Sequence, residues 1–99
     1  MDVSARTEDG VTVAVLQGEF DAHHSDGVLE ELAKVEPGPG GLVLDMSGVS
    51  FLDSAGISAL IRLREQNPEG TVSITNPSTP VKRVLGIVGL LEIFGLDPA

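Results

Sequence analysis

The chain contains no cysteine, tryptophan or tyrosine, and its only aromatic residues are three phenylalanines. Without cysteine, disulfides, thiolate metal sites and cysteine nucleophiles are excluded. Three phenylalanines are too few for a platform on which nucleic acid bases stack. No apolar run reaches the ~20 residues of a membrane span, because glycines and Glu92 interrupt the longest one, VLGIVGLLEIFGL. We therefore expect no membrane insertion.

Positive charge is also scarce, with six Lys and Arg residues against fifteen Asp and Glu, for a net charge of −9. Such a surface repels the phosphates of nucleic acids and anionic membranes, so direct nucleic acid binding is not expected and a protein partner is favoured. The first residues, MDVSARTEDG, lack the basic and apolar regions of a signal peptide, which favours a cytoplasmic protein. With 41% hydrophobic and 21% charged residues, residues 1–99 are interpreted as one globular domain.

Apolar periodicity predicts strands that alternate with helices. The expected strands cover residues 3–6, 11–20, 42–46 and 71–75. One helix is expected over residues 26–35, with Ser25 as its N-cap. A second helix is expected from about Ser54 to Gln66, where Asn67 and Pro68 end it, and a third from PSTP to about Val88. A last apolar segment then returns to the core. This order predicts an α/β fold with a mixed, mostly parallel sheet and an antiparallel N-terminal edge.

Two motifs that could bind a ligand are better explained without one. The glycine-rich segment EPGPGG has no lysine and leads from a helix into a strand, whereas phosphate-binding loops lead from a strand into a helix. His23 and His24 lie near Asp21 and Asp26, but adjacent residues at a helix start do not converge on one ion, and no second histidine cluster completes a site. We expect no metal and no cofactor, with both histidines available for surface contacts.

Ser54 lies between Asp53 and a small-residue turn, where a strand is followed by a helix. Catalysis by this serine would need a base, but the only imidazoles are His23 and His24, and the Gly-x-Ser-x-Gly elbow is absent. We therefore expect no enzymatic activity and no catalytic residue.

A second interpretation makes Asp53 or Ser54 an ordinary helix cap. Gly56 in the first turn costs up to ~1 kcal/mol relative to alanine. We expect it to leave the helix start bare, so that another protein can approach the Ser54 hydroxyl. The residues alone leave the cap and the docking point both open.

Three segments together resemble the STAS domain, in particular the bacterial anti-sigma factor antagonists. They are GEFDAHHSDGVLEEL, LVLDMSGVSFLDSAGISALI and NPSTPVKRVLGIVGLLEIF, and the likeness runs from about Val11 to Phe94. The Asp-Ser-Ala-Gly segment is its most specific part. Phe20 stands where leucine is usual in the family and Ala55 where a second serine is frequent, but neither change removes the Ser54 hydroxyl.

The resemblance implies that Ser54 is phosphorylated by a partner that is both an anti-sigma factor and a serine kinase. The unmodified domain would bind that partner and release a sigma factor, phosphorylation would end the binding, and a serine phosphatase would restore it. We also expect the domain to be a monomer when free. The partner-binding residues expected from the resemblance and from the local sequence are Asp21, His23, Asp53, Ser54, Gly56 and Ile57.

An alternative role within the same family is that of a STAS subunit in a lipid-transport ABC complex, where the domain is a structural partner of the ATPase. The intact Asp-Ser-Ala-Gly motif favours the sigma-factor pathway over this role.

Overall fold

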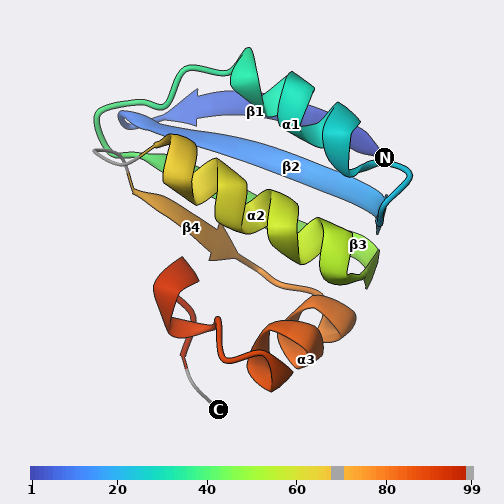
Figure 1. Ribbon diagram of the computed structural model, residues 1–99. Coiled ribbons are helices and arrows are strands. Elements are labelled where there is room, and N and C mark those ends of the chain that lie inside the picture. The colour runs from blue at the N-terminus through green and yellow to red at the C-terminus, as the bar shows by residue number, and fades with distance from the viewer. Residues whose placement is uncertain (68–70, 98–99) are drawn as a thin grey trace.

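The computed structural model describes residues 1–67 and 71–97. Its strands are β1 (Asp2–Glu8), β2 (Val11–Phe20), β3 (Leu42–Leu52) and β4 (Val72–Thr75), and its helices are α1 (Ser25–Ala33), α2 (Ser54–Gln66), α3 (Thr79–Ile87) and the short 3-10 helix η1 (Glu92–Phe94) (Figure 1). Asn67 is the C-cap of α2, as expected. Pro68, the other residue expected to end this helix, lies outside the described residues.

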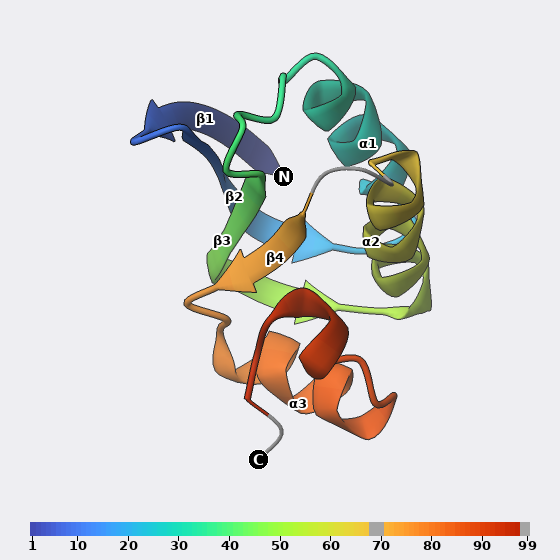
Figure 2. The ribbon, with the colours of Figure 1, turned by 90° about the vertical axis from the view of Figure 1, so that its left-hand side faces the viewer.

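The four strands form one sheet in the order β1-β2-β3-β4. β1 pairs antiparallel with β2, whereas β2, β3 and β4 are parallel. Figure 2 shows α1 and α2 together along one face of the sheet, whereas α3 and η1 lie toward its β4 side. The mixed sheet with an antiparallel N-terminal edge confirms the predicted fold class.

The core lies between the sheet and its helices. Alternate residues of β3 point into it, and Leu42, Leu44 and Met46 are almost fully buried. Phe20 from the end of β2 and Phe94 from η1 are the largest fully buried side chains. Burial of side chains of this size stabilises the fold by roughly 1.5–3 kcal/mol each.

β3 extends through Leu52, six residues beyond the predicted end at residue 46. The prediction stopped there because Ser47 and Gly48 interrupt the apolar run. The strand continues because two register shifts against β2 accommodate this polar stretch and bring Leu52 opposite Phe20. The continuous apolar run LVLDM predicts a strand covered on both faces. Val43 and Asp45 are only half-buried, however, so the second face of β3 is less covered than this run predicts.

The start of α1 also differs from the prediction. Ser25 is not the N-cap but the first residue of the helix, and its side chain is buried. His24 is the N-cap and makes no capping hydrogen bond through its side chain. The Asp21 carboxylate instead accepts from the His24 backbone N–H, at 3.1 Å. The spacing of the apolar residues in this helix predicts that Ala33 faces the core, but Ala33 is exposed.

The glycine-rich loop before β3 packs tightly against neighbouring backbone. A Cβ atom at Gly38 would collide with the carbonyl oxygen of Gly10, and one at Gly41 would lie 2.6 Å from the carbonyl oxygen of Thr71. Gly41 also has φ of +100°, where residues with a side chain are strained. These contacts explain the glycines through packing alone.

Candidate functional site

The ends of β2 and β3 bring two aspartates to one edge of the sheet. The strands are parallel and Phe20 pairs with Leu52, so Asp21 and Asp53 follow neighbouring strand ends. In open α/β sheets, this carboxyl edge is the usual place for a functional site. We call Asp21, His23, His24, Asp53 and Ser54 the strand-end cluster.

Hydrogen bonds join the turn after β2 to the start of α2. The Asp53 N–H donates to the carbonyl oxygen of Phe20, at 3.3 Å. The Ala22 N–H donates to Asp53 Oδ2, also at 3.3 Å. The two segments, which are about thirty residues apart in sequence, are therefore held together by hydrogen bonds from backbone N–H groups and not by side-chain packing alone.

Asp53 is the N-cap of α2. Its Oδ1 atom accepts from the backbone N–H of Gly56, at 3.0 Å. Replacement of such a cap with alanine typically costs about 1 kcal/mol. Of the two residues proposed as caps, Asp53 therefore has the capping role, and both of its carboxylate oxygens accept from backbone N–H groups.

Ser54 is the first residue of α2 and is exposed. Within residues 1–67 and 71–97, its hydroxyl makes no hydrogen bond. The sequence predicts that Ser47 lies in the loop before α2, but it lies within β3. Its hydroxyl donates to Asp45 Oδ1 at 2.8 Å. Ser50 and Ser58 are exposed too, but Ser54 is the one that lies at a helix N-terminus, where backbone N–H groups attract negative charge.

Asp21 makes hydrogen bonds that fix the turn containing His23 and His24. Its Oδ1 atom lies 2.7 Å from Nδ1 of His24, and the ring of His24 meets that of His23 edge to face with centroids 4.9 Å apart. Desolvation opposes ionisation of Asp21 and so raises its pKa. The net shift is nevertheless downward, because the carboxylate accepts hydrogen bonds from the His24 ring and from the backbone N–H groups of both histidines, and is attracted by the charge of His24. His23 is exposed beside this pair.

The expectation that Gly56 leaves open space for a partner is wrong. Gly56 is buried, and a Cβ atom there would lie 2.5 Å from the carbonyl oxygen of Phe20 and 2.6 Å from Cδ1 of Leu52. The glycine lets α2 approach the two strand ends closely, so it positions the strand-end cluster from inside. Ile57 is half-buried and packs against the core, which leaves part of it on the surface next to the cluster.

Sequence reasoning missed two features near the cluster. Phe51 is 48% exposed at the end of β3. Simple alternation would place Phe51 on the same face as the buried Val49, and only the register shift against Gly18 and Glu19 turns it outward. A shallow groove of about 270 Å³ lies between α1 and α2. Its lining residues are Ser25, Asp26, Leu29, Ala55, Ser58, Ala59 and Arg62.

Residues 1–67 and 71–97 contain no group of three or more His, Asp or Glu side chains placed to hold a metal ion. None of the helices described is both long enough and apolar enough to cross a membrane.

A relative from Bordetella bronchiseptica, BtrV, is named as a candidate anti-sigma factor antagonist. It is 29% identical over 89 residues, which cover 87% of this chain and 77% of the relative. The crystal structure of an anti-sigma factor antagonist from Mycobacterium paratuberculosis has a TM-score of 0.84 and 26% identity, over 99% of this chain and 86% of that one.

A third similar protein is the Bacillus cell fate determinant SpoIIAA, solved in its phosphorylated form. It has a TM-score of 0.64 and 22% identity, over 90% of this chain and 85% of that one. At this level of identity the comparison shows a common fold. The family model of the STAS domain matches residues 2–99. From its sequence and its fold, the chain belongs to the STAS domain family.

Proposed function

We propose that this protein is an anti-sigma factor antagonist whose binding is switched off by phosphorylation of Ser54. In its unmodified form it binds an anti-sigma factor through the surface around the strand-end cluster, and so releases a sigma factor. The two relatives above 25% identity support this role because both are named as antagonists of this kind. The partner is an anti-sigma factor that is also a serine kinase, and a phosphatase reverses the modification.

The observation that carries the proposal is the free hydroxyl of Ser54 at the N-terminus of α2. A kinase can reach it because the side chain is exposed. Its modification would break no hydrogen bond that the described residues make. Asp53, which caps the helix in its place, keeps the backbone of this turn fixed in either state.

Physical chemistry explains why phosphate would act on binding and not on folding. A phosphoserine adds about −1.5 to −2 charges, and the N-terminus of α2 stabilises an anion by about 0.3–1 kcal/mol. The same group would place charge and bulk beside Asp53 and Asp21 in the middle of a docking surface. Like-charge repulsion and desolvation across an interface can cost several kcal/mol.

The domain acts in this proposal as an interaction module without catalysis of its own. The carboxylate of Asp53 is engaged by two backbone N–H groups, and His24 is held by Asp21. His23 remains as an exposed contact residue, together with the accessible part of Ile57. Gly56 contributes by positioning Ser54.

The experiment starts with affinity capture from native cells, using wild-type protein and a Ser54→Glu variant as matched baits. We expect the wild type to retain a serine kinase with anti-sigma activity and the variant to retain much less of it. Intact-mass spectrometry after incubation with this kinase and ATP, followed by fragmentation, should then place one phosphate on Ser54. Ser50→Ala and Ser58→Ala are the control substrates, and both should still be modified.

Phosphate on another residue, or unchanged partner affinity after complete modification of Ser54, would contradict the switch. Capture of an ABC transporter ATPase by both baits would instead support the role of a transporter subunit.

A further inference from the structure

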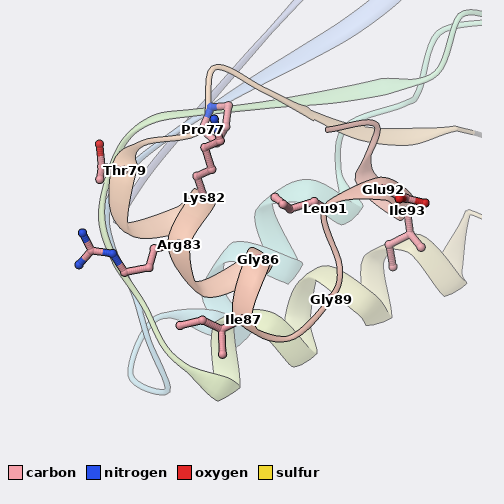
Figure 3. A pocket seen from close by; sticks show the side chains of 10 residues that line it. All are labelled: Pro77, Thr79, Lys82, Arg83, Gly86, Ile87, Gly89, Leu91, Glu92 and Ile93. Carbon is pink, nitrogen blue, oxygen red and sulfur yellow. The ribbon is translucent and has the colours of Figure 1, made fainter. Parts of the chain in front are cut away.

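An open groove of about 1130 Å³ lies between α3 and the segment that follows it, through η1. Figure 3 shows Leu91 pointing from the following segment toward α3, with Ile87 and Ile93 on the two walls. We call this feature the α3 groove. It shares no residue with the strand-end cluster, so the proposed function does not account for it.

Exposed apolar side chains gather at the α3 groove. Ile87 is 78% exposed and Ile93 is 40% exposed, and Val88, which follows Ile87 in sequence, is 47% exposed. Among the described residues, the only other large hydrophobic side chain with comparable exposure is Phe51. Large apolar side chains that are exposed around one groove are typical of sites that bind another molecule.

The lining of the groove is more basic than the rest of the surface. The whole chain carries −9, but in the groove the exposed cations Lys82 and Arg83 outnumber the one carboxylate, that of Glu92. No carboxylate in residues 1–67 or 71–97 lies within ion-pair distance of either one, whereas Arg6 pairs with Glu8 at 2.6 Å and Lys34 with Glu31 at 3.7 Å. Lys82 and Arg83 therefore remain available to acidic groups from outside.

Gly86 keeps the floor of the groove open at a cost in stability. A glycine within a helix is about 1 kcal/mol less favourable than alanine. No contact requires it, because the nearest heavy atom to a Cβ at Gly86 would be Cδ1 of Leu91, at an ordinary 3.6 Å. Gly89 differs, since its φ of +73° is the conformation that glycine adopts without strain.

We propose that the α3 groove docks an amphipathic, acidic helix of a second protein. Apolar side chains of that helix would contact the exposed Ile87 and Ile93, and its flanking carboxylates would meet Lys82 and Arg83. Helix-in-groove recognition of this kind uses apolar residues spaced three and four apart. Small-molecule sites of about 300–1,000 Å³ enclose most of their ligand, whereas this groove is open. A second copy of the chain is a poorer occupant because both copies carry −9.

The probes for the test are two designed helical peptides with leucines spaced three and four residues apart, flanked by glutamates in one and by lysines in the other. In a titration followed by amide NMR shifts, we expect the glutamate peptide to bind at least about tenfold more tightly. Its shifts should concentrate on residues 79–94. Equal affinity of the two peptides, or shifts that lie mainly elsewhere, would overturn the proposal.

Variants separate the groove from general charge effects. Lys82→Glu with Arg83→Glu should weaken the glutamate peptide about tenfold or more. The control pair, Lys34→Glu with Arg64→Glu, changes the net charge equally outside the groove and should leave affinity within about twofold. If both pairs weaken binding equally, only the overall charge matters and the groove is not the site.

A second variant tests the groove without a change in charge. Gly86→Met should unfold at the same urea concentration as the wild type or a higher one, since methionine favours helix, and it should lose about tenfold in peptide affinity by filling the groove. Unchanged affinity would contradict the proposal. So would a concentration-dependent dimer that Ile87→Glu dissociates, because the occupant would then be a second copy.

Discussion

Gly56 in α2 and Gly86 in α3 both place glycine inside a helix, but the packing of the protein requires only Gly56. A Cβ at Gly56 would meet the backbone of β2 at 2.5 Å, whereas a Cβ at Gly86 would meet only a leucine methyl group at 3.6 Å. The first glycine lets a helix approach strand ends, and the second leaves a groove open. The same residue type therefore serves internal packing at one site and an external surface at the other.

The largest expected effect follows from this difference. Gly56→Ala should lower the free energy of unfolding by about 3 kcal/mol, because the methyl group would overlap the carbonyl oxygen of Phe20 and one end of Leu52. Gly86→Ala, the matched control, should raise it by up to about 1 kcal/mol through helix propensity. Urea unfolding of both variants measures the contrast. Equal effects of the two substitutions would show that the close approach at Gly56 is not a constraint.

The next effect concerns the cap that fixes the start of α2. Asp53→Ala should cost about 1–2 kcal/mol, since it removes the acceptors for the N–H groups of Gly56 and Ala22. Asp53→Asn, which keeps one carbonyl oxygen as a cap, should lose less. If the alanine variant unfolded like the wild type, the Asp53 carboxylate would not be what joins the turn after β2 to α2.

The sequence was sufficient to predict the order of elements, the sheet type and the position of Ser54 at a helix start. These features depend on local periodicity and on the chemistry of caps and breakers. The role of Gly56 could not be predicted, because the atoms that confine it belong to Phe20 and Leu52, and only the tertiary fold places these beside it. The α3 groove was missed for a similar reason, since its apolar residues resembled an ordinary core segment.

A smaller effect is expected at Ser54 itself. Because Asp53 is the cap and the Ser54 hydroxyl is exposed, Ser54→Ala should change the free energy of unfolding by less than about 0.5 kcal/mol. Ser54→Asp should stabilise slightly, by about 0.3–1 kcal/mol, because a carboxylate is favourable at a helix N-terminus. Thermal and urea unfolding of the two variants provide the measurement. A loss above about 2 kcal/mol in either variant would mean that Ser54 has a structural role and is a poor choice for a reversible modification.

The smallest effect is a pH dependence from the pair of Asp21 and His24. The pKa of Asp21 in the folded protein is lowered below its usual 3.8 because interactions with His24 outweigh desolvation. A lowered pKa contributes stability above the unfolded-state value, and this contribution is lost as the pH falls through the folded-state value. We therefore expect the free energy of unfolding to fall as the pH decreases through and below the usual Asp value of 3.8. This fall should be less steep in Asp21→Asn than in the wild type.

His24→Ala supplies the control for this pH dependence. It removes the main partner of Asp21, so the free energy of unfolding should depend less steeply on pH, as in Asp21→Asn. The double variant, with both substitutions, should differ little from His24→Ala alone. Asp45 also has a lowered pKa, chiefly through the backbone N–H of Ser47, so part of the acid dependence should persist in all three variants. If the free energy of unfolding fell equally steeply with pH in the wild type and in Asp21→Asn, the hydrogen bond to His24 would order the turn without stabilising the ionised carboxylate.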